Sequence, residues 1–179
     1  MNSSSTEISL WMLDSSTFIN GCIIGQLPLF VLIRSPIYFS EYVFRVELGI
    51  NAREKTRRQA SMCVERSKIG IRQLSLTDLD RINELGAPRR IGLGEITSAI
   101  IAQREAGGVL CDDWRGRSWL ERRVPVTRWE SVEDLLLHAA HLNHISEFDL
   151  EQFQEALESE RYKCRYNLRL EHLRRLANR

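Results

Sequence analysis

Short apolar runs alternate along this chain with longer segments in which apolar side chains recur every three to four residues. The runs occupy residues 8–13, 36–39, 69–74, 109–111 and 124–127. Runs this short are typical of strands buried on both faces, and the spacing between them is typical of packed helices. Because parallel strands need crossover connections, the helices of such a chain cover both faces of the sheet. The sequence therefore predicts an α/β fold, a three-layer sandwich around a central, mostly parallel sheet.

Capping residues predict several helix boundaries. Thr77, with Asp80 three positions later, predicts the start of one helix. Ser131 and Ser146 are each followed at the third position by an acid, so they predict two further helix starts. Residues 165–177 are rich in basic side chains and predict a C-terminal helix.

A chain of 179 residues is long enough for one sizeable core. We expect a domain over residues 8–145, with the helices of residues 146–179 packed on it or extending it. Residues 1–7 have no basic run before the first apolar segment, so they predict a disordered tail and not a signal peptide.

Composition excludes several classes of protein. With 43% hydrophobic and 27% charged residues, the chain is not mainly disordered, collagen-like or dense in disulfides. The most apolar stretch, residues 21–33, contains Gln26 and Pro28 and is too short to cross a membrane. The four cysteines lie far apart, which favours reduced thiols. We therefore expect a cytoplasmic protein without a membrane partner.

Acidic residues follow two of the predicted strands. Asp14 comes after the first strand, and Asp112 and Asp113 come after the fourth. A single acid at such a place is usually a turn or cap residue. Ligands of open parallel sheets, however, bind outside the carboxyl ends of the strands, where these acids should converge with Glu95 and Glu47. Carboxylates crowded together need a cation, and all-oxygen ligands favour Mg²⁺ or Mn²⁺.

The ordered set of these segments resembles the PIN-domain nucleases. The resemblance rests on Leu-Asp-Ser-Ser at 13–16, Glu-Leu at 47–48, Gly-Leu-Gly-Glu-Ile at 92–96 and Leu-Cys-Asp-Asp at 110–113, with Arg117 downstream. The Gly-Glu and Asp-Asp motifs are similar to a bacterial and archaeal branch whose members are often toxins or toxin-like. The resemblance implies a PIN-like sandwich and RNA hydrolysis with Mg²⁺ or Mn²⁺.

The same resemblance implies particular roles for the acids. Asp14, Glu47, Glu95 and Asp112 would be the catalytic residues, and Asp14, Glu95, Asp112 and Asp113 would be the metal ligands. Ser16 matches a small hydroxylic residue beside the first acid. Two alternatives stay open at this point. Asp113 competes with Asp112 for the last catalytic role, and Glu41 replaces Glu47 if the helix aligns differently.

Basic residues suggest where RNA would bind. Residues 51–72 hold seven Lys or Arg against two Glu, and residues 158–179 hold seven against three. Such runs are more often solvated helix faces, but they also suit a phosphate backbone. The residues we expect to contact RNA are Ser16, Arg53, Lys55, Arg57, Arg58 and Arg117. The tryptophans at 114, 119 and 129 would either stack on bases or belong to the core.

A second function class remains, a non-catalytic PIN-like module that binds a protein or serves as a scaffold, because a fold does not establish an activity. The chain also carries more apolar residues in one segment than a short helix needs to bury, namely Ile23, Leu27, Leu29, Phe30 and Leu32. They predict either an ordinary pair of core helices or an interface with a second copy or an antitoxin protein.

Overall fold

The computed structural model describes residues 8–178, and all strand pairs within them are parallel. The strands lie in the order β3-β2-β1-β4-β5. Their bounds are β1 (Trp11–Leu13), β2 (Ile37–Ser40), β3 (Gly70–Arg72), β4 (Gly108–Leu110) and β5 (Arg128–Glu130). The predicted α/β class with a parallel sheet is confirmed, whereas the predicted tail at residues 1–7 lies outside the described residues.

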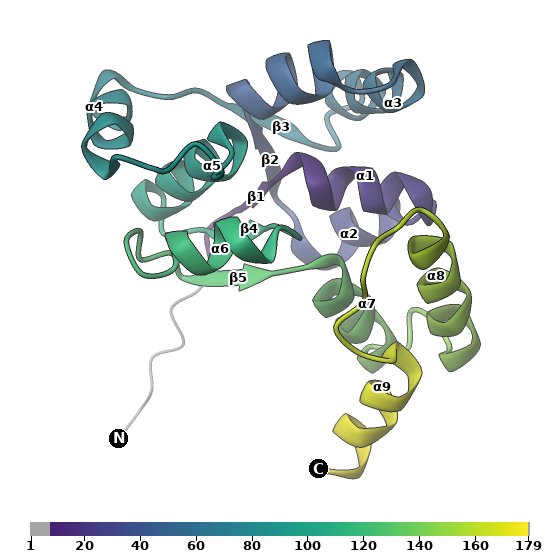
Figure 1. Cartoon of the computed structure of the whole chain (residues 1–179). Helices are drawn as coiled ribbons and strands as arrows, with labels where there is room; N and C mark the ends of the chain where they lie inside the picture. Colours follow the sequence, from purple (N-terminus) through teal and green to yellow (C-terminus); the bar gives the residue numbers. More distant parts are fainter. Residues whose placement is uncertain (1–7, 179) are drawn as a thin grey trace.

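Helices connect successive strands and then continue to the C-terminal end of the described chain (Figure 1). Nine are α-helices and one, η1, is a π-helix, counted over residues 8–178. Their bounds are α1 (Ser15–Ile23), α2 (Leu27–Arg34), η1 (Val43–Asn51), α3 (Glu54–Glu65), α4 (Leu76–Leu85), α5 (Leu93–Arg104), α6 (Trp114–Leu120), α7 (Val132–His141), α8 (Glu147–Ser159) and α9 (Leu168–Ala177). None of these helices is both long and apolar enough to span a membrane.

The sheet separates two hydrophobic cores. Trp11 and Leu13 of β1 point into one core, which α1, α2, η1, α3 and α7 share. Leu10 and Met12 point into the other, which α5 and α6 close. This division follows from strand geometry, because successive side chains point to opposite faces. Helices therefore cover both faces, as a three-layer sandwich requires.

The two C-terminal helices share the first core. Leu150 and Leu157 of α8 and Leu168 of α9 are fully buried in it. Three helices of the described chain begin with a capping box, at Ser75, Ser131 and Ser146. The boxes at Ser131 and Ser146 match the predicted helix starts.

Two local predictions are wrong. The capping box of α4 uses Ser75 and Asp78 and not Thr77 and Asp80, so the helix begins earlier than predicted. The last strand is β5 and not residues 124–127, of which Val124 follows the end of α6 in a turn. The apolar pattern of the sequence does not predict β5, because only its central residue is apolar and the residues on either side of it are charged.

The apolar segment at residues 23–32 is only partly buried. Leu29 and Phe30 belong to the core with 8% and 1% of their surface exposed, whereas Leu32 is 65% exposed. Ile23 and Leu27 are half-buried against the core. The segment thus contributes both to the core and to the surface.

Candidate active site

Asp14 directly follows the central strand β1 and is the N-cap of α1. Its carboxylate is buried and accepts hydrogen bonds from the Ser16 hydroxyl at 2.6 Å and the Ser16 N–H at 3.2 Å. Burial raises the pKa of Asp14 to about 6, with the Ser16 bonds lowering it and the charge of Glu47 raising it. Asp14 is thus a carboxylate held in a fixed position beside a second one.

Glu95 lies in the first turn of α5, where Gly92 caps the helix. Its side chain is buried, and its Oε2 atom has no hydrogen-bond partner. Burial first, and then the charges of Asp14, Asp113 and Glu47, together raise the pKa of Glu95 to about 8. A buried carboxylate oxygen without a partner is unusual in a folded protein and calls for a ligand or a functional explanation.

Glu47 is carried by the π-helix η1 and reaches the same place. The Ser15 hydroxyl donates a hydrogen bond to its Oε2 at 2.5 Å. A β-carbon on Gly94 would collide with the Glu47 carboxylate, so any larger residue there would displace this side chain from its present position. Glu41, the alternative second acid, instead forms an ion pair with Arg45 at 2.8 Å. Of these two candidates, Glu47 is the one that lies with Asp14 and Glu95.

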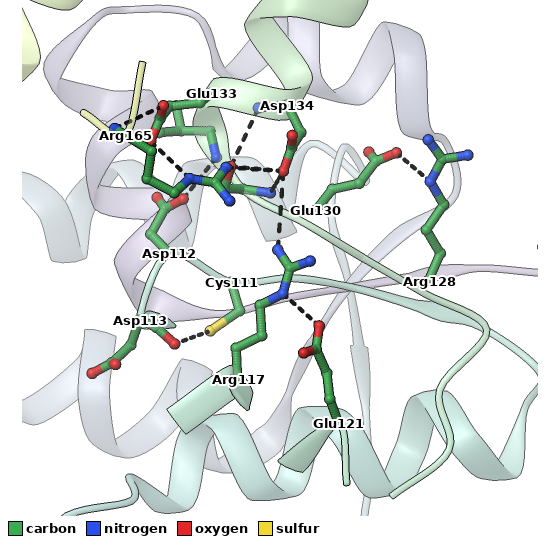
Figure 2. Close-up of polar contacts among 12 residues, drawn as sticks. Cys111, Asp112, Asp113, Arg117, Glu121, Arg128, Glu130, Glu133, Asp134 and Arg165 are labelled. Atoms are coloured by element: carbon green, nitrogen blue, oxygen red, sulfur yellow. Dashed lines mark hydrogen bonds and ion pairs between the residues drawn. The ribbon is translucent and has the colours of Figure 1, made fainter. Parts of the chain in front are cut away.

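Asp112 and Asp113 follow β4, and their carboxylates point in different directions (Figure 2). Asp112 accepts hydrogen bonds from Asn20 Nδ2 and from the Val132 N–H, each at 2.7 Å. Burial raises its pKa to about 6 in spite of these bonds. Asp113 caps α6 by accepting from the N–H groups of Arg115 and Gly116 at 2.8 and 3.1 Å.

Asp112 and Asp113 interact with different charged residues. The charge of Asp113 raises the pKa of Glu95, whereas the charge of Glu133 raises that of Asp112. We use the name carboxylate cluster for Asp14, Glu47, Glu95 and Asp113. Asp112 adjoins this cluster through Cys111, whose pKa is raised by burial and by the charges of Asp14, Glu95 and Asp112.

Gly116 of α6 belongs to the site although the sequence analysis did not single it out. A β-carbon there would occupy the space of the Glu95 carboxylate. Glycine inside a helix is destabilising by about 1 kcal/mol relative to alanine, so its presence needs a packing or functional reason. The presence of a glycine within a predicted helix could therefore have pointed to Gly116 from the sequence alone.

The predicted RNA-binding residues fall into two groups. Arg53, Lys55, Arg57 and Arg58 lie at the start of α3, where Arg53 and Lys55 line a hollow with Asn20. Arg117 lies on α6 and forms an ion pair with Glu121 at 2.8 Å. Ser16, the remaining predicted residue, donates a hydrogen bond from its hydroxyl to Asp14 and accepts one from the Asp112 N–H at 3.2 Å.

The structure also separates the three tryptophans. Trp119 and Trp129 are buried in the second core, as the core interpretation predicts for them. Trp114, the first residue of α6, is 56% exposed. It is therefore the one of the three whose ring is available to a ligand.

An all-oxygen donor set such as the carboxylate cluster fits Mg²⁺ or Mn²⁺ by its chemistry. The unpartnered Glu95 oxygen and its raised pKa are consistent with a cationic ligand. Within residues 8–178, however, no group of three or more His, Cys, Asp or Glu side chains is arranged so that it could hold a metal ion as it stands. Both oxygens of Asp112 already accept hydrogen bonds.

Comparison with family models finds no match, and no curated protein matches the chain.

Proposed function

We propose that this chain is a metal-dependent endoribonuclease of the PIN type that hydrolyses RNA phosphodiesters at the carboxylate cluster. The observation that carries the proposal is the buried, unpartnered oxygen of Glu95 among three other carboxylates at the carboxyl edge of a parallel sheet. A protein tolerates such an arrangement where a cation relieves it.

Asp14, Glu95 and Asp113, with Asp112 next to them, would hold Mg²⁺ or Mn²⁺ from this edge of the sheet. When bound, such an ion supplies acidification of a water molecule and neutralisation of charge on the phosphate. The donor set fits because carboxylate oxygens are what these ions prefer. Glu47 would act from η1, close enough to Asp14 and Glu95 for its charge to raise their pKa values.

The chain's own residues would orient these groups before RNA arrives. Ser16 fixes one oxygen of Asp14, Ser15 fixes one oxygen of Glu47, and the α6 backbone fixes Asp113. A carboxylate held by such bonds does not have to lose rotamer freedom on ligand binding. Arg117 would contact the phosphate backbone without reading sequence.

The cluster of basic residues at the start of α3 would support the same task. Arg53 and Lys55 line a hollow together with Asn20, which in turn holds Asp112. We therefore propose that Arg53, Lys55, Arg57 and Arg58 hold backbone phosphates on the α1–α3 side of the site.

The second candidate is a non-catalytic PIN-like module. One observation favours it, namely that the carboxylates of the described chain do not already form a group of three suited to a metal ion. The two candidates differ in one measurable property, RNA cleavage that depends on a divalent ion.

The test is cleavage of end-labelled single-stranded and hairpin RNAs by the purified chain with Mg²⁺, Mn²⁺ or EDTA. Asp14→Asn keeps the side-chain size but removes a charge, so we expect it to abolish cleavage. Asp80→Asn, which changes an exposed acid on α4, is the matched control and should cleave as the unmodified chain does. Cleavage that survives in EDTA, or an active Asp14→Asn variant, would refute the nuclease proposal.

We also propose that the protein serves as the toxin of a toxin–antitoxin or defence system, restrained as a homodimer or by an antitoxin protein. The exposed Leu32, together with the half-buried Ile23 and Leu27 of the same segment, would supply apolar contacts for such an interface. Light scattering at high concentration tests the homodimer, and a monomer would remove this support.

A further inference from the structure

Two hollows meet on the face formed by α6, α7 and the chain leading into α9. The smaller, of about 250 Å³, is lined by Asp112, Arg161 and Lys163, and the larger, of about 530 Å³, by Arg34 and Arg128. Both are lined by Trp114, Arg117 and Arg165, so they form one continuous surface. We call this surface the α6 basic surface.

Lysine and arginine side chains outnumber acidic ones along this surface. The larger hollow has five arginines against two acids, Glu130 and Asp134, and each of these arginines is ion-paired with an acid. The smaller hollow adds Arg161 and Lys163, and Asp112 is its one acid. The exposed side chains of Arg161 and Lys163 make no ion pair with any described residue, so their charges face solvent. The charges of Arg161 and Lys163 are therefore the ones on this surface that attract an anionic ligand.

The arginines at the centre of the surface are held in place. Arg165 pairs with the buried Glu133 at 3.2 Å and with Asp134 at 3.3 Å, and Arg117 approaches Asp134 at 3.9 Å (Figure 2). Glu133 also accepts from the Tyr162 hydroxyl at 3.1 Å. These contacts fix the chain that carries Arg161 and Lys163 against α7.

Trp114 stands at the junction of the two hollows. It is 56% exposed, whereas Trp11, Trp119 and Trp129 are buried. The Arg117 guanidinium lies 5.7 Å from the centre of its ring. An exposed indole beside several cations is the combination that binds single-stranded nucleic acids, because bases stack on the ring and phosphates contact the cations.

The position of the surface relates it to the carboxylate cluster. Trp114 immediately follows Asp113, and Asp112 lines the smaller hollow. We propose that the α6 basic surface binds a single-stranded segment that flanks the scissile phosphate, with a base on Trp114 and phosphates at Arg161, Lys163 and Arg128. That the strand is RNA rests on the proposed nuclease function.

The test measures binding separately from cleavage. The full chain, in EDTA, is titrated with a 12-nucleotide RNA, with DNA of the same sequence, and with an abasic strand of equal length. Binding is followed by anisotropy of a labelled strand and by tryptophan fluorescence. Because Trp114 is the exposed tryptophan, we expect RNA to quench the fluorescence and the abasic strand to leave it nearly unchanged.

Three variants separate the contributions. Trp114→Ala should weaken RNA binding about tenfold and abolish the quench, and Trp114→Phe should bind with an intermediate affinity. The double variant Arg161→Ala with Lys163→Ala should reduce the slope of log affinity against log salt by about 1.4. The matched control is Arg81→Ala, an exposed arginine on α4 at the opposite end of the molecule from α9 (Figure 1). It should bind as the unmodified chain does.

The outcomes distinguish this inference from the proposed function. Cleavage with unchanged binding in the Trp114→Ala and double variants would overturn the surface and leave the nuclease. Quenching and a reduced salt slope without cleavage under any metal would support the surface and refute the nuclease. DNA bound tenfold more tightly than RNA would overturn the assignment of the strand to RNA.

Discussion

Replacing Glu95 by glutamine should stabilise the metal-free protein, and the gain should increase with pH. Burial and the neighbouring carboxylates raise the pKa of Glu95 from 4.5 to about 8 in the folded chain. The folded state therefore binds more protons than the unfolded state over this interval, so the free energy of unfolding falls as pH rises. Glutamine is neutral in both states and removes that loss.

The size of the effect follows from the two pKa values. Each pKa unit corresponds to about 1.4 kcal/mol, so the interval from 4.5 to about 8 sets a limit of about 5 kcal/mol for the Glu95 side chain. The gain of the Glu95→Gln variant should be under about 1 kcal/mol at pH 5, about 3 kcal/mol at pH 7, and should level off above pH 8.

Urea denaturation in EDTA, followed by circular dichroism at pH 5, 7 and 8.5, measures the difference. Glu84→Gln, which changes an exposed glutamate on α4, controls for the loss of one carboxylate. If the free energies of unfolding of Glu95→Gln and of the unmodified chain differ by the same amount at every pH, the argument that burial and neighbouring carboxylates raise the pKa of Glu95 is refuted. Adding Mn²⁺ at pH 8.5 should stabilise the unmodified chain but not the Glu95→Gln variant.

Three further predictions follow from the same contacts. Gly116→Ala should abolish metal-dependent cleavage and lower the melting temperature, because the methyl group would occupy the space of the Glu95 carboxylate. This loss should outweigh the helix preference of alanine, and thermal denaturation and the cleavage assay measure both effects. Arg165→Ala should reduce the free energy of unfolding by about 2 kcal/mol, because it removes a charged partner of the buried Glu133. Arg169→Ala, which removes only exposed ion pairs, should lower it much less; equal losses in urea denaturation would contradict this. Cleavage rates at fixed Mg²⁺ should rise from pH 6 to pH 8, as the Glu95 carboxyl loses the proton that competes with the metal; a rate that falls over this range would contradict the assignment.

The sheet could be predicted from the sequence because most of its strands are apolar. The prediction failed for β5, which is mostly polar. β5 is an edge strand whose Glu130 is buried by pairing with Arg34 at 2.7 Å, a contact between distant parts of the chain that no local pattern reveals. The apolar Val124 was assigned to a strand instead, although it closes a turn after α6. Long-range ion pairs thus conceal strands from an analysis of hydrophobicity.

The candidate site was predictable to the level of elements but not of side chains. Acids after β1 and β4 were expected to converge because parallel strands end at one edge, and the charges of both Asp14, after β1, and Asp113, after β4, raise the pKa of Glu95. Which of Asp112 and Asp113 points toward Glu95 depends on adjacent residues that project in different directions. Likewise the π-helix that brings Glu47 beside Gly94 has no signature in the sequence.

The central position of β1 also determines when the acids can meet during synthesis. The Asp14 N–H donates to the carbonyl of Leu110, so the strand that completes this edge leaves the ribosome long after β1 does. Contacts between such distant segments form late, because loop closure must precede them. If the chain cleaves RNA as proposed, this delay would keep the unfinished chain from cleaving the mRNA that is being translated.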